Sequence, residues 1–108
     1  MILVIGGFAA GKRAWVRDHL GRREEDFSRD PSDNCPVLYD LQELGLSGPE
    51  ALADKEVVIC NEIGSGLVPV DPAERARRER VGRLCCALAA QADQVVRVVC
   101  GVGTVIKG

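Results

Sequence analysis

The chain has 108 residues, of which 46% are apolar, with 16 acidic and 14 basic side chains. This length and composition predict a single globular domain over residues 1–108 and exclude a disordered tail or a multidomain protein. The net charge of -2 argues against nucleic acid as a partner, and no apolar run approaches the roughly 20 residues that cross a bilayer. We therefore expect a cytoplasmic protein with neither a nucleic-acid nor a membrane partner.

The first twenty residues predict a strand followed by a helix. Residues 1–5 form an apolar, β-branched run closed by two glycines, which is typical of a strand buried on both faces of a parallel sheet. Apolar residues then recur at helical spacing from Lys12 to Leu20, before Gly21. The polar and charged residues 21–34 are interpreted as a surface connection.

Short apolar runs predict two further strands, over residues 36–40 and 56–60. The first ends in Asp40 and the second runs into Asn61 and Glu62. Ligands of open parallel sheets bind beyond the carboxyl ends of the strands, so these polar residues are candidate site residues.

A long helix is predicted from Pro72 to Gln91. Asp71 is suited to accept hydrogen bonds from first-turn amides, Pro72 suits the first helical position, and Glu74 has the position of a capping-box residue. The arginines on this helix are interpreted as a solvated face with i,i+4 pairing, and a phosphate-binding patch is the alternative. They are Arg75, Arg77, Arg78, Arg80 and Arg83.

Two strands over residues 95–100 and 104–106, separated by residues 101–103, predict a hairpin. Together the elements indicate an α/β fold with a mostly parallel central sheet and a C-terminal hairpin. The five cysteines include no C-x-x-C pair and do not indicate a zinc site. Cys60 and Cys100 are interpreted as small buried hydrophobic residues.

A glycine-rich loop between the first strand and helix has the pattern of a phosphate-binding loop. Its glycines allow backbone amides to face one anion, the helix amino terminus adds partial positive charge, and the lysine reaches the β- and γ-phosphates of a purine nucleotide, ATP or GTP. The alternative is a glycine-rich turn without a ligand. The predicted nucleotide-binding residues are Gly6, Gly7, Phe8, Ala9, Ala10, Gly11, Lys12 and Arg13.

Arg13 departs from this pattern, because a Ser or Thr normally follows the lysine and ligates Mg²⁺. A guanidinium is always charged and does not ligate metal ions. Asp40 is the candidate acid that holds Mg²⁺; an acid that caps a strand-to-loop turn is one alternative, and a salt bridge between Arg13 and Asp40 in place of the metal is another.

Asn61 and Glu62 are followed by a turn that contains Gly64 and Gly66. This arrangement can place an amide and a carboxylate over a bound substrate, so all four residues are predicted to bind substrate and Glu62 to act in catalysis. An ordinary glycine-containing loop is the alternative.

Residues 57–108 carry the pattern Asn-Glu-x-Gly-x-Gly-x-Val-Pro over 61–69, followed by R-x-R-x-x-x-x-G-R-L over 75–84 and the ending VVCGVGTVIKG. With the opening ILVIGGFAAGK, this pattern resembles the bifunctional adenosylcobinamide kinase and adenosylcobinamide-phosphate guanylyltransferase family of cobalamin assembly. The resemblance implies a P-loop NTPase-like three-layer domain that phosphorylates the aminopropanol arm of cobinamide, a corrinoid. It further implies that Lys12 stabilises charge on the transferred phosphoryl group, that Asp40 positions the metal, and that Asn61 and Glu62 face the substrate alcohol.

The family attaches GMP through a histidine in a helical insertion between the phosphate loop and the acidic strand. This chain has only residues 21–34 there, without histidine, and its single histidine, His19, lies on the first helix. We therefore expect guanylyltransferase activity to be lost. Two alternatives stay open: a non-catalytic nucleotide- or corrinoid-binding module, and a scaffold or subunit-interaction domain without a ligand. Homo-oligomerisation is also expected, because a short domain has few ways to cover both faces of its sheet.

Overall fold

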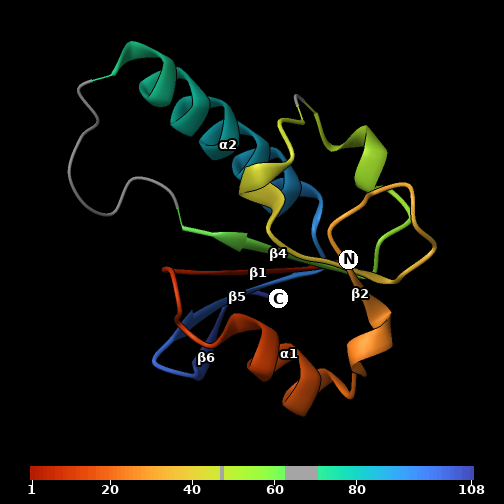
Figure 1. Cartoon of the computed structure of the whole chain (residues 1–108). Coiled ribbons are helices and arrows are strands. Elements are labelled where there is room, and N and C mark those ends of the chain that lie inside the picture. Colours follow the sequence, from red (N-terminus) through yellow and green to blue (C-terminus); the bar gives the residue numbers. More distant parts are fainter. Residues whose placement is uncertain (47, 63–70) are drawn as a thin grey trace.

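A sheet of six strands with helices on both faces forms the part of the chain that the computed structural model describes, residues 1–46, 48–62 and 71–108 (Figure 1). The helices include short 3₁₀ helices, labelled η. In chain order the elements are β1 (Ile2–Gly6), α1 (Lys12–Leu20), η1 (Glu24–Asp26), β2 (Phe27–Ser28), β3 (Val37–Leu38), η2 (Leu41–Glu43), η3 (Pro49–Leu52), β4 (Val57–Asn61), α2 (Pro72–Gln91), β5 (Gln94–Val99) and β6 (Val102–Lys107).

The sheet has the order β2-β3-β4-β1-β5-β6, and its neighbouring strands are parallel except for the antiparallel pair β5 and β6. α1 covers one face and α2 the other (Figure 1). The predicted three-layer α/β fold with a mostly parallel sheet and a C-terminal hairpin is therefore confirmed.

β1 lies in the middle of the sheet, between β4 and β5. Its last residue, Gly6, is paired in register with Asn61 of β4 and Val98 of β5. The amide of Glu62 also donates to the Gly6 carbonyl, at 2.7 Å. The loop that follows β1 therefore starts beside Asn61 and Glu62, although more than fifty residues separate them in the chain.

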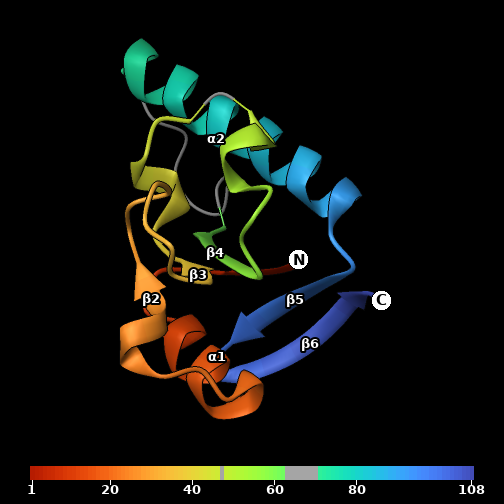
Figure 2. The same cartoon turned by 90° about the vertical axis from the view of Figure 1, so that its right-hand side faces the viewer.

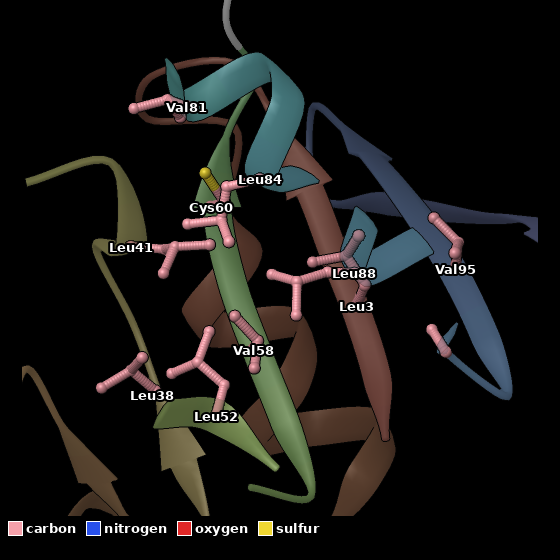
Figure 3. Packing of buried hydrophobic residues seen from close by; sticks show 11 residues of the cluster. Leu3, Leu38, Leu41, Leu52, Val58, Cys60, Val81, Leu84, Leu88 and Val95 are labelled. Atoms are coloured by element: carbon pink, nitrogen blue, oxygen red, sulfur yellow. The ribbon is translucent and has the colours of Figure 1, made fainter. Parts of the chain in front are cut away.

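The core has one part on each face of the sheet. On the α1 face, Val16 packs with Val4, Ile59 and other valines of the sheet. On the α2 face, Leu84 and Leu88 lie over β1 and β4 (Figure 3). The strands of the sheet centre are buried on both faces, which explains their continuous apolar sequences. The larger cluster consists of Leu3, Leu38, Leu41, Leu52, Val58, Cys60, Val81, Leu84, Leu88, Ala92 and Val95.

Residues 21–34, predicted as a surface connection, contain η1 and the edge strand β2, so that prediction was incomplete. β2 has two residues, Phe27 and Ser28, which pair in parallel with β3. A strand this short has no periodic sequence pattern from which it could be predicted. A tertiary contact stabilises β2 instead: the Phe27 ring packs edge-on against Tyr39, with the centroids 6.3 Å apart.

The strand predicted over residues 36–40 is shorter, because β3 ends at Leu38. Asp40 has a left-handed backbone (φ 55°) and is the N-cap residue of η2. The strand cannot continue through that conformation, so Asp40 lies in a turn just beyond the sheet.

The turn of the hairpin consists of Cys100 and Gly101, whereas the sequence predicted a turn over residues 101–103. Both turn residues have positive φ, 50° and 77°, which is the conformation of a two-residue turn between twisted strands. β6 consequently starts at Val102, and Cys100 is exposed, so the prediction of a buried Cys100 was wrong. Figure 2 shows β5 and β6 side by side, with the turn close to α1.

α2 has the predicted bounds, and Asp71 accepts a hydrogen bond from the Ala73 amide at 2.9 Å. The arginine face is solvated only in part. Arg83 pairs with Glu79 at i,i+4, as expected, but Arg77 reaches across to Glu43 of η2. No helix within residues 1–46, 48–62 and 71–108 is long and apolar enough to span a membrane.

Gly82 lies within α2, where a Cβ atom would meet no atom within 4 Å. Replacing Gly82 with alanine is expected to raise the free energy of unfolding by about 0.5–1 kcal/mol, because alanine loses less backbone freedom on folding. Urea denaturation measures this change. Gly103→Ala is the contrasting variant, because its Cβ would overlap the Trp15 ring and should destabilise the fold. A loss of stability in Gly82→Ala would contradict the open space at this position.

Candidate nucleotide-binding site

The loop between β1 and α1 has the backbone geometry of a phosphate loop. Ala9 and Gly11 have positive φ, 57° and 88°, and the Ala10 amide donates to the Gly7 carbonyl at 3.2 Å. The Ala10 carbonyl accepts from the Gly101 amide at 2.8 Å, so the hairpin turn holds the loop from behind. At Gly6 only glycine fits, since a Cβ would lie 2.5 Å from the Val98 carbonyl oxygen.

The amino terminus of α1 is open to an anion. Gly11 is the N-cap and provides no side-chain hydrogen bond, and the first turn contains no acidic residue. First-turn amides of a helix have no intrahelical partner and carry partial positive charge. At the start of α1 these amides therefore face the loop uncompensated by a side chain.

Lys12 is buried, with 8% of its surface exposed. Its Nζ donates to the Gly7 carbonyl at 2.7 Å, across the loop. Burial lowers the pKa of Lys12, and the nearby Cys60, Asp40 and Glu62 act against that shift. A phosphate group would be a stronger partner for this ammonium group than a neutral carbonyl, because a hydrogen bond between two charged groups is the stronger one.

A cavity of about 690 Å³ opens at this loop and reaches from the start of α1 to the ends of β3 and β4. Phe8 stands at its edge with 91% of its surface exposed. The volume is in the range of small-molecule sites. The lining residues are Phe8, Ala9, Ala10, Gly11, Lys12, Arg13, Ala14, Arg17, Glu24, Phe27, Arg29, Asp40, Gln42, Glu43, Ile59 and Asn61.

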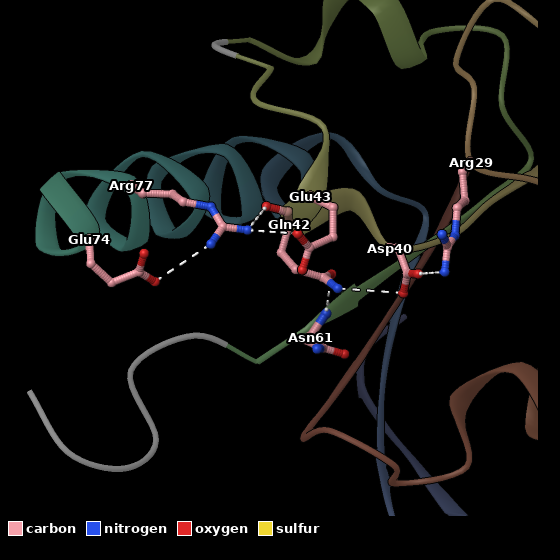
Figure 4. A network of polar contacts seen from close by, with 7 residues as sticks. All are labelled: Arg29, Asp40, Gln42, Glu43, Asn61, Glu74 and Arg77. Carbon is pink, nitrogen blue, oxygen red and sulfur yellow. Dashed lines mark hydrogen bonds and ion pairs between the residues drawn. The ribbon is translucent and has the colours of Figure 1, made fainter. Parts of the chain in front are cut away.

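A chain of polar contacts connects the segment after β2, the start of η2 and the end of β4 (Figure 4). Arg29 pairs with Asp40 at 2.9 Å, and the Gln42 amide group lies 3.4 Å from the Asp40 carboxylate. The Gln42 side-chain oxygen accepts from the backbone N–H of Asn61 at 3.0 Å. Gln42 therefore fixes the position of Asp40 relative to the end of β4.

The alternative of a salt bridge between Arg13 and Asp40 was wrong, because Arg29 occupies that position. The Arg13 guanidinium lies over the Tyr39 ring instead, 4.9 Å from its centroid. Arg29 comes from the segment predicted as a surface connection, and β2 brings it to the site.

Asn61 and Glu62 lie at the end of β4, as predicted. Asn61 lines the cavity, and Glu62 pairs with Arg97 of β5 at 3.1 Å. Gly64 and Gly66 lie outside the described residues, so their predicted substrate contacts stay predictions.

The side chains of the cavity do not fit a magnesium site. Its carboxylates, from Glu24, Asp40 and Glu43, are each paired with an arginine, and Arg13 stands where a ligating hydroxyl is required. Nowhere in residues 1–46, 48–62 and 71–108 do three His, Cys, Asp or Glu side chains form a metal-binding group. The expected role of Asp40 in holding a metal ion stays a prediction. In the structure the Asp40 carboxylate forms a salt bridge with Arg29.

His19 is not among the residues that line the cavity; its ring stacks on Trp15 with the centroids 4.9 Å apart. Cys60 is buried as expected, with its Sγ 3.5 Å from that of Cys85. This contact and burial raise the pKa of Cys60, which leaves a thiol of low reactivity.

Sequence reasoning missed Arg29, Gln42 and Arg97. Gln42 follows the candidate residue Asp40 by two positions, and this proximity in the sequence could have indicated that Gln42 also lies at the site. No such indication exists in the sequence for Arg29 and Arg97, because only the pairing of β2 with β3 brings Arg29 to the cavity, and only the pairing of β1 with β5 brings Arg97 to Glu62.

The parallel sheet and the strand-loop-helix unit at its centre define an α/β protein of the P-loop NTPase-like class. The family model described as cobinamide kinase / cobinamide phosphate guanyltransferase matches residues 40–106, more than half of the chain. The chain belongs to this family, which confirms the resemblance noted in its sequence.

Two curated relatives share the name bifunctional adenosylcobalamin biosynthesis protein CobU. The protein from Salmonella typhimurium is 45% identical over 53 residues, and the one from Escherichia coli is 43% identical over 53 residues. The matched segment covers 49% of this chain and 29% of the length of each relative.

Proposed function

We propose that this chain is a cobinamide kinase-like protein of cobalamin biosynthesis that binds ATP or GTP at residues 6–13. The acceptor is the hydroxyl of the aminopropanol arm of cobinamide. One observation carries the proposal: in a member of this family, Lys12 and the amino terminus of α1 meet Asp40 and Asn61 around one cavity. The family match begins at residue 40, so the geometry of the loop supports the nucleotide half of the proposal independently.

The proposed step is an in-line transfer of the γ-phosphoryl group. The alcohol oxygen forms a bond to the γ-phosphorus, the bond from this phosphorus to the β,γ-bridging oxygen breaks, and the nucleoside diphosphate leaves. Lys12 stabilises the charge on the transferred group, while Asn61 orients the alcohol and Glu62 accepts its proton. Glu62 is half-buried and pairs with Arg97. It follows Asn61 directly in the chain, but it is not among the residues that line the cavity.

The second activity of the family, transfer of GMP, is absent from our proposal. That reaction proceeds through a histidine, and the chain has one histidine, His19, whose ring is stacked on Trp15. In the sequence, residues 21–34 hold the position of the family's histidine-bearing insertion and contain no histidine.

A non-catalytic nucleotide- or corrinoid-binding module is the second candidate. The salt bridge of Asp40 with Arg29 favours it, together with Arg13 in place of the hydroxyl. These features leave the phosphate loop intact and remove the usual metal chemistry.

Incubation of the protein with adenosylcobinamide and γ-labelled ATP or GTP, followed by chromatography of the corrinoid, tests the kinase. Labelled cobinamide phosphate is expected with the native chain and not with Lys12→Ala. Saturable nucleotide binding without this product would support the module. Absence of binding to both the nucleotide and adenosylcobinamide would contradict both candidates and leave a scaffold. Label from α-labelled GTP on the protein would contradict the loss of guanylyl transfer. Homo-oligomerisation stays a prediction, which light scattering measures.

A further inference from the structure

Two arginines that line the cavity, Arg13 and Arg29, place their guanidinium groups over one aromatic ring. The Cζ atoms of Arg13 and Arg29 lie 4.9 Å and 5.4 Å from the Tyr39 ring centroid. Tyr39 is held by its edge-on contact with Phe27, and its amide donates to the Ser28 carbonyl at 3.1 Å. A planar guanidinium stacks well on such a ring, so Tyr39 keeps both cations beside the phosphate loop.

The charges that line the cavity do not balance. Each carboxylate already has an arginine partner: Glu24 pairs with Arg17, Asp40 with Arg29 and Glu43 with Arg77. Within the described residues no carboxylate pairs with Arg13 or with Lys12. The loop therefore carries surplus positive charge, to which the open amino terminus of α1 adds.

A divalent cation would enter this site against that charge. In P-loop enzymes the ion neutralises the β- and γ-phosphates from the position of the Ser or Thr hydroxyl. Here that position is Arg13, whose five N–H donors suit phosphate oxygens. Arg29 is two-thirds exposed, at 67%, so its side chain is free to exchange the Asp40 carboxylate for a phosphate.

We propose that this site binds the nucleoside triphosphate free of any divalent cation, with Arg13 and Arg29 on the Tyr39 ring neutralising the phosphates in its place. This inference rests on the proposed nucleotide site and specifies the form of nucleotide that it takes. Lys12 and the α1 amides bind the same phosphates from the loop side.

Isothermal titration of the full chain with ATP and with GTP, in EDTA and in excess MgCl₂, tests the inference. In EDTA both the affinity and the stoichiometry are expected to be at least those in MgCl₂, because complexation by Mg²⁺ lowers the free triphosphate concentration. Affinity about tenfold or more higher in MgCl₂ would overturn the inference and leave the proposed function standing. Absence of binding in both buffers would contradict the proposed function itself.

Variants separate the two arginines. Arg13→Ser is expected to lower the affinity in EDTA about tenfold or more and to make binding stronger in MgCl₂ than in EDTA, since the hydroxyl is restored. Arg29→Ala should lower the affinity in EDTA without that gain. Arg83→Ala is the matched control, because Arg83 is exposed on α2 and pairs with Glu79. Unchanged affinity of Arg13→Ser in EDTA would overturn the assignment.

Arg13 and Arg29 are exposed and lie outside the core, so their replacement should not unfold the protein and a change in affinity reports on binding. A competition experiment with inorganic tripolyphosphate tests whether the arginines bind the phosphates. Competition with ATP in EDTA is expected, because the arginines act on phosphates alone; failure to compete would contradict their role.

Discussion

Replacement of Lys12 with alanine is expected to lower the affinity for ATP or GTP by about 100-fold, which corresponds to roughly 3 kcal/mol. Lys12 is 8% exposed, and its ammonium group donates across the loop to the Gly7 carbonyl. Alanine removes both the charge and the donor from the place where the phosphates would bind. Isothermal titration in the buffer that gives the tightest native binding measures the loss.

Two further variants make this result specific. Lys12→Met retains the buried methylene chain without the charge and should bind as poorly as Lys12→Ala, whereas Arg83→Ala should bind like the native chain. Thermal denaturation shows whether each variant is folded. If folded Lys12→Met bound ATP and GTP with native affinity, the loop would be a glycine-rich turn without a nucleotide, which is the alternative left open by its sequence.

Replacement of Leu88 with alanine is expected to lower the free energy of unfolding by about 2–5 kcal/mol. Leu88 is 1% exposed and packs in the cluster with Leu3 and Leu84, between α2 and the sheet (Figure 3). A small domain has a total stability of about 5–15 kcal/mol, so this single cavity is a large fraction of it. Urea denaturation followed by circular dichroism measures the change.

Cys86→Ala is the matched control on the same helix, because the Cys86 side chain is exposed. Its free energy of unfolding should stay within about 0.5 kcal/mol of the native value. A loss below about 1 kcal/mol in Leu88→Ala would show that α2 is not held to the sheet by this cluster.

The helices and the buried strands were predictable, since each has a period or a continuous apolar run. α1 and α2 have the predicted bounds, and β1 and β4 lie within one residue of theirs. β2 was not predictable, because a two-residue strand has no period. The hairpin was predicted with a three-residue turn; its actual turn depends on a positive φ at Cys100, which its residue type does not favour.

The candidate site likewise has one part that the sequence predicted and one part that it did not. The glycine-rich loop of the proposed nucleotide site is encoded locally, by glycines at Gly6 and Gly11 where a side chain would clash or be strained, and by Lys12 at the start of a helix. The partner of Asp40 was not encoded locally. The sequence suggested Arg13, but the pairing of β2 with β3 brings Arg29 to the carboxylate, and Arg13 stacks on Tyr39.

By itself the sequence determined the fold class, the glycine-rich loop between β1 and α1, and the family, because these depend on residue spacing and on conformations that few residue types tolerate. Only the tertiary structure decided which charges are paired and which are left over. Ion pairs such as Glu62 with Arg97 join residues far apart in the chain, and their formation depends on strand order and register. The surplus charge at Lys12 and Arg13, and with it the inference of metal-free nucleotide binding, arises from that arrangement.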